Sequence, residues 1–137
     1  MTLKRILHVD DEPDIREIAE TTLKALGGFE VLALSSGKEA LELVEGFAPD
    51  LIIIDVMMPE MDGPTTLAEL RKIPASKNTP VIFMTAKVQS HEVDPLLELG
   101  AAGVIPKPFD PMLLCDQIHN ICNNIANSSK KNHKELD

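Results

Sequence analysis

The sequence predicts a three-layer α/β fold, in which a five-stranded parallel sheet of the doubly wound kind is covered by helices on both faces. Short apolar runs of strand length alternate five times with stretches whose apolar residues recur at helical spacing. This alternation is typical of parallel sheets, because right-handed crossovers place helices on both faces. Five such strands fit the order 2-1-3-4-5. The length of 137 residues favours a single domain.

Each strand is predicted from a short apolar run bounded by turn-forming residues. Gly27 and Gly28 end the first helix and lead into the second strand, and Pro49 and Asp50 break the chain before the third. The predicted strands are Leu3–Val9, Phe29–Leu34, Leu51–Ile54, Pro80–Met84 and Val104–Ile105.

Each helix is predicted from its apolar periodicity and its capping residues. Pro13 is a first-turn proline that opens the first helix, and Ser35 or Ser36 caps the second. Asp110 is the expected cap of the last helix, which Pro111 opens. The first helix ends near Leu26, the second near Phe47, the third runs from Pro64 to about Ile73, the fourth ends near Leu99, and the last near Ala126.

Pro95 lies where the fourth helix is expected. A proline inside a helix removes one hydrogen bond and costs about 3 kcal/mol, whereas Asp94 is a good cap and Pro95 a good first helical residue. The expected outcome is a short helix from Pro95 to about Leu99, preceded by a mobile loop from Gln89 to Asp94, with a kinked longer helix as the alternative.

Composition and charge exclude several function classes. The net charge of −9 argues against nucleic-acid binding by this domain and against binding to anionic membrane surfaces. No apolar run approaches the ~20 residues of a membrane span, and the charged start of the chain leads directly into a strand, with no signal peptide. A cytoplasmic protein is therefore expected.

The histidines and cysteines are expected to be structural. Cys115 and Cys122 lie seven residues apart in one predicted helix, about 10 Å along its axis, which is too far for a disulfide. His8 lies in the first strand and is expected to be buried with its polar atoms paired. Residues 1–126 are predicted to form the globular domain, and the polar segment 127–137 a flexible C-terminal tail.

Polar residues follow four of the predicted strands. Asp10 and Asp11 follow the first strand, Asp55 the third, Thr85 the fourth and Lys107 the fifth. Because the carboxyl ends of parallel strands meet at one edge of the sheet, these side chains are expected to form one pocket. Three adjacent carboxylates repel one another, and a hard cation such as Mg²⁺ relieves that repulsion.

The same set of residues suits phosphate chemistry. The carboxylates hold the metal, Lys107 supplies positive charge to a phosphoryl oxygen, and Thr85 donates a hydrogen bond. One carboxylate can itself act as the nucleophile and form an acyl phosphate. Catalysis then requires only positioning and neutralisation of charge.

Four motifs together resemble the receiver domain of two-component response regulators, over about Lys4 to Asn124. Each motif alone is weakly specific, but their order and spacing are highly specific. They are Val9-Asp10-Asp11-Glu12-Pro13, the run from Ile54 to Gly63, Met84-Thr85-Ala86 and Lys107-Pro108-Phe109. The resemblance implies a flavodoxin-like receiver fold for residues 1–126.

The resemblance also implies a role for each matching residue. Asp55 is the expected phosphoacceptor, and the bond between Lys107 and Pro108 is expected to be cis. The expected catalytic residues are Asp55, Thr85 and Lys107. The expected Mg²⁺ ligands are Asp10, Asp11, Asp55 and the carbonyl of Met57, and the expected phosphate-binding residues are Thr85, Ala86 and Lys107.

The implied function is signalling rather than catalysis on a separate substrate. A histidine kinase or histidine phosphotransfer protein supplies the phosphoryl group, and the face of the fourth helix, fifth strand and fifth helix contacts a downstream protein. The domain is expected to be a monomer or a weak phosphorylation-dependent dimer. The alternatives are a phosphorelay intermediate, a receiver excised from a larger regulator, and a Mg²⁺-dependent phosphatase-like enzyme.

Two further positions depart from the family pattern. Many receivers place an aromatic residue three positions before the lysine of the fifth strand, and this chain has Val104 there. An aromatic rotamer switch is therefore not expected. Pro106 restricts Ile105 to extended geometry and stiffens the end of the strand.

Overall fold

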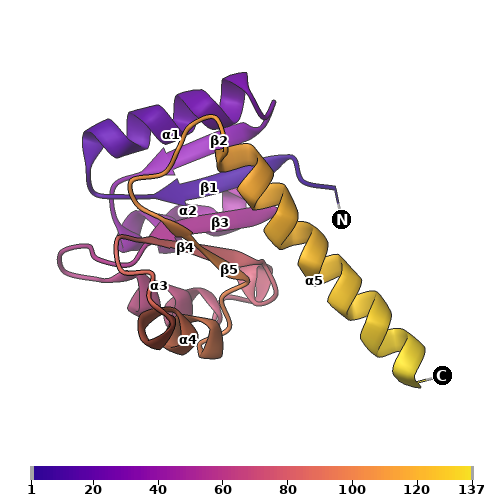
Figure 1. Ribbon diagram of the computed structural model, residues 1–137. Helices are drawn as coiled ribbons and strands as arrows, with labels where there is room; N and C mark the ends of the chain where they lie inside the picture. The colour runs from indigo at the N-terminus through magenta and orange to yellow at the C-terminus, as the bar shows by residue number, and fades with distance from the viewer. Residues whose placement is uncertain (1, 137) are drawn as a thin grey trace.

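A five-stranded parallel sheet with the order β2-β1-β3-β4-β5 forms the centre of the protein (Figure 1). This arrangement, seen in a computed structural model, confirms the predicted fold class and strand order. The structure describes the backbone of residues 2–136 and the side chains of residues 2–126. The strands are β1 (Arg5–Val9), β2 (Glu30–Leu34), β3 (Leu51–Asp55), β4 (Val81–Thr85) and β5 (Gly103–Pro106).

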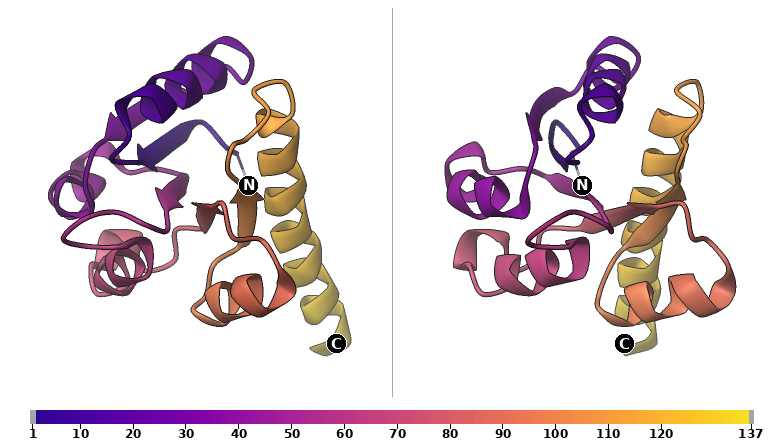
Figure 2. Two further views of the ribbon diagram at one scale, coloured as in Figure 1. Left: turned by 60° about the vertical axis from the view of Figure 1, so that its left-hand side comes forward. Right: turned by 90° about the vertical axis from the view of Figure 1, so that its left-hand side faces the viewer.

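Helices cover both faces of the sheet, as Figure 2 shows. Helices α1 and α5 pack on one face, and α2, α3 and α4 on the other. The helices are α1 (Pro13–Ala25), α2 (Gly37–Phe47), α3 (Gly63–Leu70), α4 (Ser90–Glu98) and α5 (Leu114–Leu136), with a short 3-10 helix η1 (Pro74–Ser76) after α3.

Alternating side chains of the strands divide the core into two layers. Along β3, Ile52 and Ile54 face the α2–α4 layer, whereas Leu51 and Ile53 face the α1/α5 layer. All four side chains are fully buried. A strand buried on both faces needs apolar residues at every position, which explains the continuous apolar run in the sequence.

Side-chain caps fix the helix starts on the α2/α3 side. Ser36 Oγ accepts a hydrogen bond from the backbone N–H of Glu39 (3.2 Å), and the Glu39 carboxylate accepts one from the N–H of Ser35 (3.1 Å). Hydrogen bonds from the Ser35 hydroxyl, the Ser35 N–H and the Ser36 hydroxyl to this carboxylate hold the pKa of Glu39 below its usual value. Asp62 caps α3 by accepting a hydrogen bond from the N–H of Thr65 (2.8 Å). The caps satisfy backbone donors that have no partner inside the helix.

The predictions of a short fourth helix and of a loop before it are wrong. Helix α4 begins at Ser90 and passes through Pro95, so the longer helix, the alternative, is the one that forms. Pro95 lies in the second turn, where its missing N–H removes only one bond, that to the carbonyl of His91. The carbonyl of Pro95 still accepts from Leu99 N–H (3.2 Å), and Leu96 is buried against the core, so packing offsets the loss.

Other element boundaries differ from the sequence prediction by a few residues, except at the end of the last helix, which continues to Leu136. The last helix begins at Leu114 instead of Pro111, because Asp110 first forms a turn in which its carboxylate accepts from Met112 N–H (2.9 Å). Helix α3 ends at Leu70 instead of Ile73, and α5 continues beyond Ala126. The predicted flexibility of the tail 127–137 concerns side chains outside the described residues, so it stays a prediction.

His8 is buried but unpaired. Its side chain is fully buried in β1, and neither ring nitrogen has a hydrogen-bond partner among the described residues. Burial, followed by the charges of Lys107 and Arg16, lowers the pKa of His8 to about 4. The expectation that its polar atoms are paired is therefore wrong, since the side chain lies in an apolar layer between sheet and helices.

Two further sequence predictions, on the cysteines and on one peptide bond, agree with the structure. Cys115 and Cys122 are free thiols, and burial raises the pKa of both. The peptide bond between Lys107 and Pro108 is cis, as the family resemblance implied. Among the described residues, no helix combines the length and the apolar character needed to cross a membrane.

Candidate functional site

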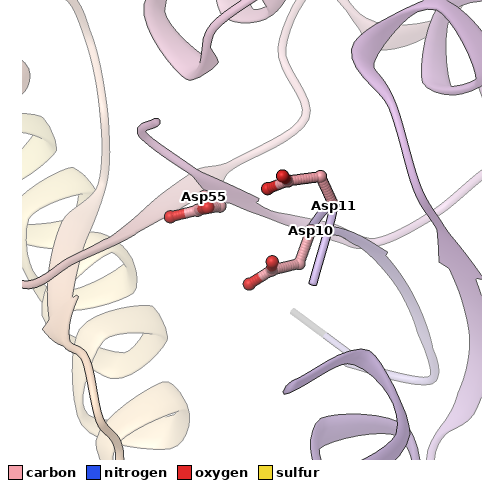
Figure 3. Close-up of side chains that lie close together, drawn as sticks. All are labelled: Asp10, Asp11 and Asp55. Carbon is pink, nitrogen blue, oxygen red and sulfur yellow. The ribbon is translucent and has the colours of Figure 1, made fainter. Parts of the chain in front are cut away.

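Three aspartates meet at the carboxyl edge of the sheet (Figure 3). Asp10 and Asp11 follow β1, and Asp55 is the last residue of β3. Each contributes one carboxylate oxygen to a group whose members all lie within 4.8 Å of one another. Neighbouring parallel strands β1 and β3 therefore bring together residues that are 45 positions apart in sequence (55 minus 10).

Asp10 is the most constrained of the three. Its side chain is fully buried, one carboxylate oxygen accepts a hydrogen bond from Glu12 N–H (2.9 Å), and the other contacts Lys107 Nζ (3.0 Å). The carbonyl of Asp10 accepts a hydrogen bond from the Arg16 guanidinium (2.8 Å). These contacts hold the start of the loop between β1 and α1 in one position.

Lys107 reaches across the site from the loop after β5. Its side chain is 12% exposed, and its Nζ lies 3.0 Å from Asp10, 3.3 Å from Glu12 and 3.4 Å from Asp55. Burial disfavours the charge, but the hydrogen bond with Asp10 and the charge of Asp55 outweigh it, so the pKa of Lys107 is raised. Lys107 is therefore a fixed ammonium in the pocket.

The carboxyl group of Asp55 carries unrelieved repulsion. Burial and then the charge of Asp10 raise its pKa to about 6, although Lys107 acts in the opposite direction. A cation bound among the three carboxylates would relieve this repulsion, and carboxylate oxygens are ligands that suit Mg²⁺. The donor set of Asp10, Asp11 and Asp55 therefore fits a hard divalent cation.

A cavity of about 230 Å³ opens beside Asp55. Thr85 at the end of β4 is buried, and its Oγ1 accepts a hydrogen bond from Lys87 N–H (3.0 Å). The cavity is lined by Glu12, Asp55, Met57, Thr85, Ala86, Lys87 and Lys107. The cavity is large enough to admit a phosphoryl group, and Thr85 and Lys107 offer it a hydroxyl and an ammonium. Met57 lies at the wall as expected, and metal binding through its carbonyl stays a prediction.

Helix α3 begins against the backbone of Asp55. A Cβ atom added to Gly63 would lie 2.7 Å from the Asp55 carbonyl oxygen and 2.9 Å from Val56 Cα. The Gly63 N–H donates a hydrogen bond to the carbonyl of Val56 (2.9 Å). The absence of a side chain at Gly63 thus lets α3 close over the end of β3 and supports Asp55 from behind.

All the site residues predicted from sequence lie together, but two further contacts were not predicted. Glu12 is part of the first sequence motif but had no predicted role in the site, and it contacts Lys107. Arg16 was not singled out, and it binds the carbonyl of Asp10. The signal for Glu12 was present in the sequence as a third consecutive acidic residue.

This chain belongs to the response regulator receiver domain family, whose model matches residues 6–119. Among curated proteins it is similar to a probable transcriptional regulator, ycf27, of Porphyridium aerugineum, at 36% identity over 97% of this chain and 54% of that protein. It is also similar to the response regulator SaeR of Staphylococcus epidermidis, at 37% identity over 96% of this chain and 54% of that protein. The chain thus spans about half the length of these relatives.

Solved structures show the same fold. The chemotaxis response regulator CheY4 of Vibrio cholerae matches with a TM-score of 0.81 and 32% identity, over 88% of this chain and 99% of that one. The receiver domain of a sensor histidine kinase from Pseudomonas aeruginosa matches with a TM-score of 0.75 and 27% identity, over 87% and 97% of the two chains. In that structure a magnesium ion is coordinated in the active site cleft.

Proposed function

We propose that this domain accepts a phosphoryl group on Asp55 in a Mg²⁺-dependent reaction and thereby regulates a protein partner. One observation carries the proposal. The buried Asp55 carboxylate belongs to a cluster of acidic oxygen donors and lies 3.4 Å from the ammonium of Lys107, beside a cavity large enough to admit a phosphoryl group. The donor is a phosphohistidine in a histidine kinase or a histidine phosphotransfer protein.

The chemistry follows from the positions of the residues. Asp10, Asp11 and Asp55, with the carbonyl of Met57, would hold a Mg²⁺ ion, which would supply positive charge that offsets the phosphoryl oxygens. An Asp55 oxygen forms the new bond to phosphorus while the P–N bond of the phosphohistidine breaks and its electron pair returns to the imidazole. Lys107 Nζ lies 3.4 Å from an Asp55 oxygen, so it can attract an oxygen of a phosphoryl group bound to Asp55.

The hydroxyl of Thr85 and the N–H of Ala86 bind the remaining phosphoryl oxygens. Thr85 Oγ1 presently accepts a hydrogen bond from Lys87 N–H, which leaves its hydroxyl hydrogen free to donate toward the cavity. Movement of Thr85 on phosphorylation transmits the change to the neighbouring strand and helix. Val104 replaces the usual aromatic residue, so this movement is read through packing instead of an aromatic rotamer change.

The output surface is the face formed by α4, β5 and α5, which contacts a downstream protein. Leu97 and Leu99 at the C-terminal end of α4 are 42% and 54% exposed, which suits a protein contact. The net charge of −9 supports a protein target over nucleic acid for this domain. The domain acts in the cytoplasm, as a monomer or a weak phosphorylation-dependent dimer, with no separate substrate.

Two arrangements of the whole protein remain compatible with this role. The curated relatives are about twice as long as this chain, which supports a receiver that forms part of a larger regulator. Solved receiver domains of sensor histidine kinases are also similar to it, which supports a phosphorelay intermediate. Transfer of phosphate from the phosphorylated domain to a histidine phosphotransfer protein distinguishes the relay.

Intact mass spectrometry tests the proposal. The protein is incubated with a small acyl phosphate and Mg²⁺, and its mass is expected to rise by one phosphoryl group. Asp55→Asn should not gain this mass, whereas Asp62→Asn, which changes the helix cap of α3, should gain it. Equal labelling of wild type and Asp55→Asn would show that Asp55 is not the acceptor.

A further inference from the structure

Glu12 makes a contact with Lys107 that the proposed phosphotransfer does not require. Glu12 Oε1 lies 3.3 Å from Lys107 Nζ, and the two residues are 95 positions apart in sequence. The Glu12 side chain is 59% exposed and lines the cavity beside Asp55. It belongs to no metal-ligating group found among the described residues, where Asp10, Asp11 and Asp55 form the acidic cluster.

The Glu12 carboxylate is available for this contact because it does not cap its own helix. Glu12 is the N-cap residue of α1, yet its side chain makes no capping hydrogen bond. Its backbone N–H is held by the Asp10 carboxylate (2.9 Å), which fixes the direction in which the side chain leaves the loop. The carboxylate therefore lies at the mouth of the cavity and reaches Lys107 there.

Lys107 is consequently held by three carboxylates at once. Asp10 and Asp55 contact Nζ from inside the pocket, whereas Glu12 contacts it from the solvent side. Two of these contacts are hydrogen bonds, from Nζ to Asp10 (3.0 Å) and to Glu12 (3.3 Å), and the third is an ion pair with Asp55 (3.4 Å). When a phosphoryl oxygen arrives on Asp55 and competes for the Lys107 ammonium, the exposed hydrogen bond with Glu12 is the least costly to break.

We propose that Glu12 is a positioning residue that restrains Lys107 in the unphosphorylated domain and slows phosphorylation of Asp55. The inference rests on the proposed function, since its consequence is a rate of phosphoryl transfer. Glu12 draws Lys107 toward the mouth of the cavity and competes with the incoming phosphoryl oxygens for its hydrogen atoms. Its removal leaves Lys107 free to bind the phosphoryl group sooner.

The restraint can be measured without phosphate or metal. In chelator-treated protein, the amines are labelled briefly with acetic anhydride, and labelling of Lys107 is compared with that of exposed Lys38 by peptide mass spectrometry. Glu12→Gln should label Lys107 about two- to fivefold faster than wild type, the range for loss of a partly exposed ion pair. Glu17→Gln removes the same charge from the exposed surface of α1 and should leave the ratio unchanged. Unchanged Lys107 labelling in Glu12→Gln overturns the proposal.

The consequence for phosphorylation is tested through Lys107. With a small acyl phosphate and Mg²⁺, Glu12→Gln should be phosphorylated up to about fivefold faster than wild type. In the Lys107→Ala background, the same Glu12→Gln change should give no acceleration. Equal acceleration in both backgrounds would mean that Glu12 acts by repelling the anionic donor and would overturn the proposal. If wild type is not phosphorylated at all, the proposed function fails, and the labelling experiment still decides whether Glu12 restrains Lys107.

Discussion

Replacement of Gly63 by alanine tests how closely α3 must approach Asp55. The new methyl group would lie 2.7 Å from the Asp55 carbonyl oxygen, 2.9 Å from Val56 Cα and 3.0 Å from the buried Phe83 ring. Two of these neighbours are backbone atoms at the end of a central strand, which cannot rotate away. Helix α3 must therefore shift outward, or the end of β3 must bend.

The size of the effect follows from the crowding. Overpacking of this kind costs about 1–3 kcal/mol, which lowers the midpoint of thermal unfolding by about 3–10 °C for a domain of this length. Gly46 provides the matched control, because it lies in α2 and an added Cβ would meet no atom within 4 Å. Gly46→Ala should therefore stabilise the protein by about 0.5–1 kcal/mol through the restricted unfolded chain.

The two variants are compared by thermal unfolding followed with far-ultraviolet circular dichroism, since the chain has no Trp or Tyr for an intrinsic fluorescence probe. The expected result is a lower midpoint for Gly63→Ala and a higher one for Gly46→Ala. If Gly63→Ala is as stable as wild type, or if both variants shift in the same direction, the close approach of α3 to Asp55 does not constrain the fold.

Three further predictions concern the site and its surroundings. Millimolar Mg²⁺ should raise the midpoint of thermal unfolding of chelator-treated wild type, because only the folded chain brings the acidic cluster together. Asp11→Ala should abolish this rise. An unchanged midpoint in wild type would count against the site. Lys107→Ala should keep Mg²⁺ binding, measured by the same midpoint shift, but lose most of the difference between free and beryllofluoride-treated protein in amide exchange of α4; the reverse pattern would contradict its role. The pKa of His8 is about 4 in the folded protein and near 6.5 when unfolded, so its contribution to stability is complete above pH 6.5 and declines as the pH falls toward 4. Over this pH range, the free energy of unfolding measured by urea titration should fall by up to about 3 kcal/mol more in wild type than in His8→Leu. The comparison with the variant is needed because Asp55, whose pKa is about 6, makes the folded state of both proteins more stable as the pH falls. Identical pH profiles for the two proteins would refute the burial argument.

The sequence predicted the site well because the chemistry lies where strands end. Asp10, Asp55, Thr85 and Lys107 each follow an apolar run, and a parallel sheet places the carboxyl ends of its strands at one edge. Their meeting point therefore follows from the alternation of strands and helices. The strand order 2-1-3-4-5 came with the fold class and the family resemblance, and the structure confirms it.

The errors arise where tertiary packing overrides local preference. Asp94 and Pro95 are good residues for starting a helix, but α4 begins at Ser90, because the five additional helical residues from Ser90 to Asp94 and the packing of Leu96 in the core outweigh one lost hydrogen bond. The contact of Glu12 with Lys107 depends on the direction in which the Glu12 side chain leaves its loop, and no periodicity in the sequence predicts that direction. The lack of partners for His8 likewise depends on neighbours from other elements.

The long sequence separation between residues of the site has a consequence for the chain while it folds. Asp10 and Lys107, which touch at 3.0 Å, are 97 residues apart, and β5 must be in place before the ammonium reaches the pocket. A nascent or partly folded chain that lacks β5 contains Asp55 but not the ammonium that lies beside it in the folded protein. The proposed coupling between phosphate on Asp55 and the surface of the domain therefore requires that the whole sheet has assembled, so incompletely folded molecules should not transmit a signal.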